Sequence, residues 1–248
     1  MGKKEVESIK PYNEMEGKGS QIKRMFDAIA SKYDVMNRLI SLGCDKRWRS
    51  SAIKELKRYP HENILDIATG TGDMAVMLYD MLDPVSVTGC DISEGMLKVA
   101  REKADEIGLS DKILFEVGDC TVLPFGDDVF DVATIAFGIR NFEDLSKGLS
   151  EIQRVLKPGG VLSIIELSVP KNRLCGLFYN IYTGVIIPAL GRILAKDTSA
   201  YLYLGHSVKA VPQGVAMTVL MKDAGFENCK FRYMTFGVCA VYTGVIPF

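Results

Sequence analysis

Short apolar runs alternate with amphipathic stretches through the middle of the chain. Each apolar run is bounded by glycine or polar residues, which is typical of a buried strand, and each stretch between runs has apolar residues at helical spacing. Ser93 is a candidate N-cap for the second of these helices. The predicted strands cover residues 63–68, 85–90, 113–117, 129–136 and 161–167, and the predicted helices cover 73–82, 94–107 and 144–156, the last ending at a Pro-Gly-Gly turn. This alternation predicts an α/β fold, with a parallel sheet covered by helices on both faces.

The flanking segments have different patterns. Helices are predicted at 22–31 and 48–58, whereas residues 1–20 are polar and are expected to be mobile until something binds there. Residues 172–221 are helical and apolar, and two strands are predicted near 230–233 and 237–243. Since no Pro/Ser-rich linker interrupts the chain, we expect one domain over 1–248, with an N-terminal helical cap (1–58) and an inserted helical segment (172–221).

A glycine-rich loop follows the first predicted strand. Residues 66–73 contain Asp66, Thr69, Gly70, Thr71 and Gly72 and lead into a predicted helix. Glycines let a ligand approach the backbone, whose exposed amides can bind it. The match to the dinucleotide fingerprint Gly-x-Gly-x-x-Gly/Ala is weak by itself, because a tight strand-to-helix turn also explains it.

Acidic residues at the ends of the next two strands strengthen the ligand interpretation. Asp91 closes the second strand, 19 residues after Gly72, where a carboxylate can accept both hydroxyls of a ribose. Asp119 and Cys120 follow the third strand, within reach of an adenine amino group. Because open α/β sheets bind ligands at the carboxyl ends of their strands, we expect a nucleoside there.

Two nucleoside cofactors fit this pattern. A nicotinamide dinucleotide needs amides for its pyrophosphate, whereas S-adenosylmethionine carries a sulfonium cation that nearby acids attract. Asp66 and Asp73 flank the glycine loop and favour the sulfonium without excluding the dinucleotide.

Composition and charge argue against several classes of binding partner. The formal net charge is −1, so no global field attracts nucleic acid. The six cysteines include no Cys-x-x-Cys pair and there are two histidines, so neither a disulfide framework nor a zinc site is expected, and no metal is assigned. The N-terminus lacks an apolar signal sequence, and polar residues interrupt the apolar stretch 177–195. We therefore expect a cytoplasmic protein without a transmembrane helix.

Further motifs resemble known enzymes. The glycine loop, Asp91, Gly118-Asp119, the Leu-Pro-Phe at 123–125 and the Leu-Lys-Pro-Gly-Gly at 156–160 resemble the class I S-adenosylmethionine methyltransferases over about residues 60–168. The motifs at 26–30, 33–37, 41–43 and 48–49, Phe-Gly-Ile-Arg-Asn at 137–141 and Thr-Phe-Gly-Val at 235–238 resemble the ubiquinone/menaquinone biosynthesis C-methyltransferases over nearly the whole chain.

That resemblance implies a Rossmann-like fold with a seven-stranded, mostly parallel sheet. It implies S-adenosylmethionine-dependent methylation of a ring carbon of a polyprenylated quinol, demethylmenaquinol or the benzoquinol equivalent. Cofactor positions carry over to Thr71, Asp91, Asp119 and Cys120. The chain departs from the family pattern at Gly205-His206-Ser207, where His206 replaces a carboxylate.

Carbon methylation suggests roles for particular residues. An electron-rich ring carbon requires a quinol oxyanion, and Arg140, just beyond the fourth strand, is the candidate to stabilise it. An ion pair with an acid is the alternative role for Arg140. His206, Tyr201 and Tyr33 are candidate general bases.

A polyprenyl tail requires contact with a membrane. The apolar, aromatic residues between Tyr179 and Leu194 form either a lid or a wall for the tail that also rests on the bilayer, with Lys171, Arg173 and Arg192 near the headgroups. We expect peripheral membrane association and allow for a homodimer. A nicotinamide oxidoreductase and a non-catalytic scaffold of a quinone-synthesis complex remain open as alternatives.

Overall fold

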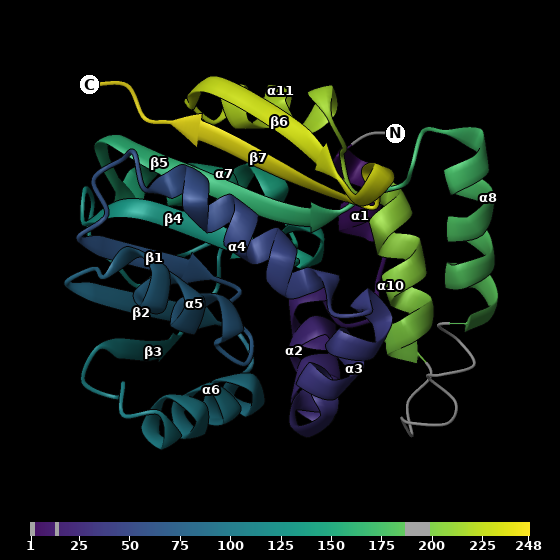
Figure 1. The fold of residues 1–248 in the computed structure, drawn as a ribbon, viewed down its shortest axis with the longest axis horizontal. Helices are drawn as coiled ribbons and strands as arrows, with labels where there is room; N and C mark the ends of the chain where they lie inside the picture. The colour runs from purple at the N-terminus through teal and green to yellow at the C-terminus, as the bar shows by residue number, and fades with distance from the viewer. Residues whose placement is uncertain (1–2, 13–14, 187–198) are drawn as a thin grey trace.

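A seven-stranded sheet forms the centre of the molecule (Figure 1). The structure is a computed structural model that describes residues 3–12, 15–186 and 199–248. The strands are β1 (Asn63–Ile67), β2 (Ser86–Asp91), β3 (Ile113–Val117), β4 (Phe130–Ala136), β5 (Leu156–Leu167), β6 (Glu227–Met234) and β7 (Cys239–Val245). Their order across the sheet is β3-β2-β1-β4-β5-β7-β6.

The first five strands are parallel, and β7 runs antiparallel between β5 and β6. The predicted seven-stranded, mostly parallel sheet is therefore confirmed. Strand β1 lies between β2 and β4, so the chain reverses its direction of travel across the sheet after β3. In open α/β sheets such a switch point lies beside the ligand-binding crevice.

Helices cover both faces of the sheet, because alternate residues of each strand point to opposite sides. Ile64 belongs to the buried cluster that contains residues of α4 (Cys44–Leu56), α5 (Asp73–Leu82) and α6 (Glu94–Glu106), whereas Leu65 belongs to the cluster that contains residues of α7 (Leu145–Val155) and α11 (Val215–Asp223). Figure 1 shows α4 and α5 in front of the sheet and α7 behind it. The Ser93 hydroxyl accepts a hydrogen bond from the Met96 amide, which confirms the predicted N-cap of α6.

Most predicted boundaries differ from the structure by a few residues, and the difference near residue 156 has a clear cause. The helix predicted at 144–156 ends at Val155, and β5 begins at Leu156, before the Pro-Gly-Gly sequence that was predicted as a turn. The Gly159 amide instead donates to the carbonyl of Ile246, and the Ile246 amide donates to Gly160. Long-range pairing with the C-terminal residues thus outweighs the local turn preference of this segment.

In the structure the cap comprises α1 (Lys3–Ser8), α2 (Lys18–Ile29), a 3₁₀ turn (Ala30–Lys32) and α3 (Tyr33–Ser41), whereas α4, which also falls within the predicted range 1–58, packs with the core of the sheet. The expectation that residues 1–20 are mobile is wrong for the described part of this segment. The Val6 side chain is fully buried, and the Lys18 ammonium donates hydrogen bonds to the carbonyls of Val6, Arg140 and Phe142. This buried lysine joins the cap to the segment that follows β4.

The inserted segment contains α8 (Arg173–Ile181), a π-helical turn, η3 (Tyr182–Ile186), and α10 (Ser199–Ala210). Residues 187–198 lie outside the described residues. They include Ile187, Pro188, Leu190, Ile193 and Leu194, predicted as part of the lid or tail wall, and Arg192, predicted to lie near the headgroups. Within the described residues, no helix has both the length and the apolar character needed to cross a membrane.

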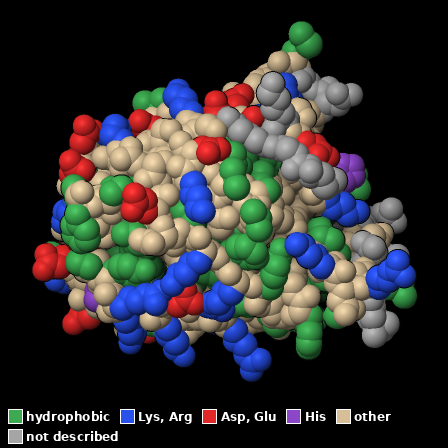
Figure 2. Space-filling view, turned by 90° about the horizontal axis from the view of Figure 1, so that it is seen from above, with side chains coloured by type: hydrophobic (Ala, Val, Ile, Leu, Met, Phe, Trp, Pro, Cys, Tyr) green, Lys and Arg blue, Asp and Glu red, His purple; other side chains and the backbone are tan. Residues whose placement is uncertain are grey.

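The surface seen from above in Figure 2 carries charged side chains of both signs, with Lys and Arg side chains along one edge. Small apolar patches lie between them, which agrees with the balanced charge of the sequence. Among the described residues, no group of three or more His, Cys, Asp or Glu side chains is arranged to hold a metal ion.

Candidate active site

Two adjoining cavities lie where the carboxyl ends of the strands meet the cap. The first is lined by the glycine loop after β1, the ends of β2 and β3, and residues of α2. The second, of about 350 Å³, lies between α2, α3 and α10. Phe26, Tyr33 and Asn141 line both cavities, so a ligand in one would contact a ligand in the other.

The glycine loop has a left-handed backbone at three positions. Ala68, Gly70 and Gly72 have φ of 54°, 58° and 79°. A side chain at Gly72 would also place its Cβ 2.9 Å from the Phe115 ring, so position 72 requires glycine for two reasons. Gly70 lines the first cavity with open space beyond its Cα, which leaves its backbone accessible to a ligand.

Asp66 lies beneath this loop and is fully buried. Its carboxylate accepts hydrogen bonds from the hydroxyls of Thr134 and Thr69, both at 2.6 Å. Burial raises the pKa of Asp66 to about 6, against the opposing effect of the two hydroxyls. Asp66 therefore shapes the loop from below, and it is not among the residues that line the first cavity.

Asp91, at the end of β2, lines the first cavity and connects two segments of backbone. One carboxylate oxygen accepts the Gly70 amide and the other accepts the Ser93 amide, both at 2.9 Å. Burial raises the pKa of Asp91, while these amides act in the opposite direction. Because each carboxylate oxygen has a second lone pair, Asp91 can still accept hydrogen bonds from two hydroxyls.

Asp119 and Cys120, after β3, also line the first cavity. The Asp119 carboxylate accepts the amide and hydroxyl of Thr121 at 2.8 and 2.9 Å, which fixes the turn at this position. Burial raises the pKa of the Cys120 thiol well above its usual range, so this cysteine stays a neutral apolar contact.

Two aspartates of the cap fasten it to the cofactor-side loops. Asp27 accepts the Ser93 hydroxyl at 2.6 Å and the Gly95 amide at 2.9 Å at the start of α6. Asp34 accepts the Thr71 hydroxyl at 2.5 Å and pairs with Lys103 at 2.9 Å. The cap thus closes the first cavity through polar contacts that water can replace.

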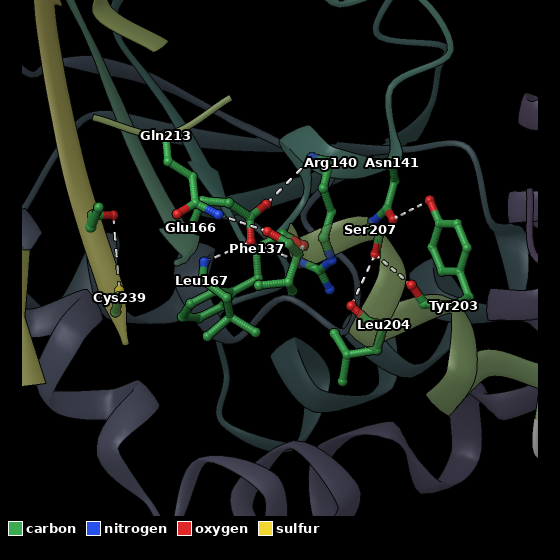
Figure 3. A network of polar contacts seen from close by, with 12 residues as sticks. Phe137, Arg140, Asn141, Glu166, Leu167, Tyr203, Leu204, Ser207, Gln213 and Cys239 are labelled. Atoms are coloured by element: carbon green, nitrogen blue, oxygen red, sulfur yellow. Dashed lines mark hydrogen bonds and ion pairs between the residues drawn. The ribbon is translucent and has the colours of Figure 1, made fainter. Parts of the chain in front are cut away.

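Arg140 faces the second cavity from the turn after β4. Its guanidinium pairs with Glu166 of β5 at 2.8 Å and donates to the carbonyl of Phe137, as Figure 3 shows. Burial acts to lower the pKa of Arg140, but Glu166 and nearby tyrosines outweigh it, and the pKa lies above its usual value. The Nε of Arg140 is itself buried and has no hydrogen-bond partner in the described part of the chain.

Tyr203 of α10 adds a second polar group beside Arg140. Its hydroxyl donates to the Asn141 side chain at 3.1 Å (Figure 3). Burial raises the pKa of both Tyr203 and Tyr33, so both phenols stay protonated at neutral pH. Apart from these groups the second cavity is mostly apolar, with residues such as Met25, Ile29 and Ile40.

The chain is similar to a known family over nearly its whole length. The ubiE/COQ5 methyltransferase family matches residues 14–246. The chain belongs to the ubiE/COQ5 methyltransferase family. A "Demethylmenaquinone methyltransferase" of Bacteroides fragilis is 50% identical over 96% of this chain and 97% of its own length. A "Ubiquinone/menaquinone biosynthesis C-methyltransferase UbiE" of Geobacter sulfurreducens is 42% identical over 92% of this chain and 89% of its own length.

Solved structures share the fold at much lower identity. The [4+2]-cyclase SpnF has a TM-score of 0.68 and 17% identity, over 92% of this chain and 96% of its own. A Haemonchus contortus phosphoethanolamine N-methyltransferase 2 in complex with S-adenosyl-L-methionine has a TM-score of 0.59 and 18% identity, over 80% of this chain and 53% of its own. These likenesses confirm the Rossmann-like, class I methyltransferase fold.

Membership of the ubiE/COQ5 family makes the chain a methyltransferase, and neither the nicotinamide oxidoreductase nor the scaffold alternative gains support. Of the residues predicted to bind cofactor, Gly70, Asp91, Asp119 and Cys120 line the first cavity. Asp66, Thr69, Thr71 and Gly72 lie behind that lining and shape the loop or bind the cap. Their individual roles stay predictions.

The predicted catalytic residues lie in different places. Arg140 faces the second cavity and also forms the ion pair that was its alternative role. His206 is exposed on α10 and lines neither cavity, and the Tyr201 side chain is outside the described residues. Tyr33 lines both cavities.

Sequence analysis missed Glu166, Tyr203 and Lys18. Glu166 is the one charged residue of the apolar stretch 161–167, and that position was its only signal. Tyr203 differs from the predicted Tyr201 by two positions, which places the two on different sides of a helix.

Proposed function

We propose that this methyltransferase methylates a ring carbon of a polyprenylated quinol, with S-adenosyl-L-methionine as methyl donor. One observation carries the proposal: a buried arginine, held in place by Glu166, lines a mostly apolar cavity of about 350 Å³ that adjoins a nucleoside-type site. The relatives named for demethylmenaquinone and for ubiquinone/menaquinone methylation support the quinol as substrate.

The first cavity suits S-adenosyl-L-methionine. Gly70 offers accessible backbone, Asp91 offers two carboxylate oxygens for the ribose, and Asp119 lies beside them for the adenine. When bound, the cofactor supplies an electrophilic methyl group on its sulfonium. The carboxylates around the loop favour such a cation by Coulomb attraction.

The second cavity suits the quinol. A ring carbon becomes nucleophilic when a neighbouring hydroxyl is ionised, and Arg140 stabilises that oxyanion through its fixed positive charge. Glu166 holds the guanidinium in place, so its orientation is set before the substrate arrives. Apolar residues of α2 and α3 exclude water and accommodate the first part of the isoprenoid tail.

The hydroxyl proton of the quinol needs an acceptor, and so does the hydrogen of the methylated ring carbon, which must leave as a proton to restore the aromatic ring. Of the three predicted bases, Tyr33 is the described side chain that reaches the cavities, but its raised pKa suits hydrogen bonding to the substrate better than proton removal. His206 is exposed, which gives it access to solvent but not to the ring. We infer that Arg140 lowers the pKa of the bound quinol, so that a weak acceptor is sufficient.

The same substrate class implies the protein's location. A polyprenyl tail partitions into a bilayer, so we infer a cytoplasmic enzyme that associates peripherally with the membrane. Light scattering of the purified protein would decide between a monomer and the homodimer allowed for above.

The proposal is tested with purified protein, methyl-labelled S-adenosyl-L-methionine and short-tailed demethylmenaquinol or benzoquinol, kept reduced. We expect one methyl group on a ring carbon, identified by mass spectrometry and NMR. The quinol that is methylated faster identifies the ring of the natural substrate. Methylation on oxygen, or no product from either quinol with a folded protein that binds the cofactor, would refute it.

A further inference from the structure

One helix of the cap has apolar side chains on its outer surface as well as on its inner one. Met36, Asn37 and Ile40 of α3 line the second cavity. On the opposite side Val35, Leu39 and Leu42 are 60%, 41% and 76% exposed. Val35, exposed Arg38 and Leu39 follow the i, i+3, i+4 spacing of one helical stripe, and Leu42 follows directly after the helix as its left-handed C-cap.

The charges around this stripe have one sign. Between residues 33 and 49 the only acids are Asp34 and Asp45. Asp34 binds Thr71 and Lys103, and Asp45, which is 2% exposed, pairs with Arg49. Both acids are therefore neutralised on the inner side of the cap.

Three bases of the same segment are exposed. Arg38, Lys46 and Arg47 form no salt bridge within the described ranges 3–12, 15–186 and 199–248, although Arg38 is near enough to Asp73 of α5 to help lower the pKa of that carboxyl. An apolar stripe bordered by exposed bases has the composition of a surface that binds anionic lipid.

We propose that the outer face of α3, formed by Val35, Arg38, Leu39 and Leu42 with Lys46 and Arg47 of α4, docks on an anionic membrane surface. This inference rests on the proposed function, since α3 separates the quinol cavity from the docking surface. Tyr182 of η3 donates to the carbonyls of Leu39 and Ile40 and so connects α3 to the inserted segment. A substrate tail leaving the cavity past α3 would enter the bilayer directly.

Two other surface sites have only one of the two features of the proposed docking surface. Lys54 and Lys57, at the other end of α4, are exposed, but the adjoining apolar residues Ile53 and Leu56 are fully buried. On α11, Val215 and Val219 are 67% and 46% exposed at i, i+4 spacing. These two sites therefore provide matched controls for the charge and for the apolar contact.

The experiment is flotation of the purified full chain with phosphatidylcholine vesicles that contain or lack phosphatidylglycerol. We expect binding to the anionic vesicles. L39Q/L42N should weaken it about tenfold or more, because apolar contact is lost. K46E/R47E should weaken it by at least about tenfold, from roughly fivefold per charge near the surface. V215Q/V219Q and K54E/K57E should bind as the unmodified chain does.

Two methylation assays separate loss of membrane docking from loss of catalytic activity. Methylation of a short-tailed quinol in solution should be the same in all four variants, while methylation of a long-tailed quinol in anionic vesicles should fall for the α3 and Lys46/Arg47 variants alone. If flotation is lost equally in the controls, or if L39Q/L42N changes the oligomeric state by light scattering without changing flotation, the docking surface is refuted. Flotation does not depend on methyl transfer, so its result tests the docking surface even if the proposed methylation is wrong.

Discussion

Arg140 is 6% exposed and Glu166 is 2% exposed, so their pair is shielded from solvent on both sides. A buried ion pair contributes little net stability, but removing one partner leaves an uncompensated charge. The ion pair therefore explains how the positive charge of Arg140 is kept at the wall of the second cavity.

Arg140→Ala should lower the rate of single-turnover methylation of a short-tailed quinol by about 10²–10³, the usual effect of losing one oxyanion donor. Cofactor affinity should change little, and Arg140→Lys should recover only part of the rate because it lacks the planar fork. A rate within about threefold of the unmodified enzyme would reduce Arg140 to a structural residue.

Stability needs its own control for this variant. Arg140→Ala leaves Glu166 buried and unpaired, at a cost of about 3–5 kcal/mol in the free energy of unfolding. The double variant R140A/E166Q removes that charge and should regain much of the stability in urea unfolding, without regaining the rate. Recovery of both would mean that misfolding caused the loss.

Asp91→Ala should weaken S-adenosyl-L-methionine binding by roughly 1.5–3 kcal/mol, the range for hydrogen bonds to a charged group. The variant also loses the acceptor of the Gly70 and Ser93 amides, so the loop itself becomes less ordered. Calorimetric titration gives the affinity, with Asp111→Ala at an exposed position as control. Unchanged affinity in a folded Asp91→Ala protein would remove the ribose assignment.

At the scale of elements, the cap helices are held by polar groups that differ in burial. Lys18 of α2 is 1% exposed, whereas the Asp34 and Lys103 side chains are 22% and 23% exposed. Water therefore cannot readily replace the hydrogen bonds of Lys18, whereas it can replace those of Asp34. This difference suggests that the α1–α2 junction stays attached while the part of the cap near Asp34 opens.

Lys18 should make stability depend on pH. Burial lowers the pKa of Lys18 from 10.5 to about 8, so between these values the unfolded chain binds more protons than the folded one. Stability therefore rises with pH in this window, by roughly 3 kcal/mol for this group. In urea unfolding, the difference between the unmodified chain and Lys18→Met should grow in favour of the unmodified chain from pH 8 to 10, while Lys98→Met on the surface should show no such trend. A difference that is constant with pH would contradict the shifted pKa.

The cap should also respond to the cofactor. The first cavity has a volume of about 70 Å³, well below the ~300–1,000 Å³ of typical ligand sites, so binding requires the cap to move and then close around the ligand. Residues 18–41 and the described parts of 172–212 should gain hydrogen-exchange protection with S-adenosyl-homocysteine and a quinol analogue. Equal exchange with and without these ligands would show that both segments are a fixed scaffold.

At the scale of the whole molecule, cofactor binding couples to unfolding. A ligand at about 100 times its Kd stabilises the folded state by about 2.7 kcal/mol. For a chain of 248 residues we expect S-adenosyl-homocysteine to raise the Tm by roughly 5–10 °C. NADH at the same concentration should leave the Tm unchanged, and the reverse pattern would favour a nicotinamide site.

Local sequence patterns were sufficient to predict the strands, one helix cap and part of the cofactor site. The alternating runs predicted the five parallel strands, the cap of α6 at Ser93, and the positions of Gly70 and Asp91 at the sheet edge. These predictions succeed because the spacing of apolar residues and the hydrogen bonds of a helix cap depend on only a few neighbouring residues. The family motifs extended the prediction to the seven-stranded sheet and the methyltransferase activity.

The contacts between distant side chains depend instead on how the whole chain packs. Glu166 reaches Arg140 from 26 residues away, and Lys18 reaches the carbonyl of Arg140 from 122 residues away. The rotation of α10 about its axis decides whether Tyr203 or His206 faces the cavity. Because α10 has apolar residues on several sides, its sequence does not specify that rotation. Long-range contacts between buried charges and the orientation of a helix are set by packing of the whole chain, and no local pattern encodes them.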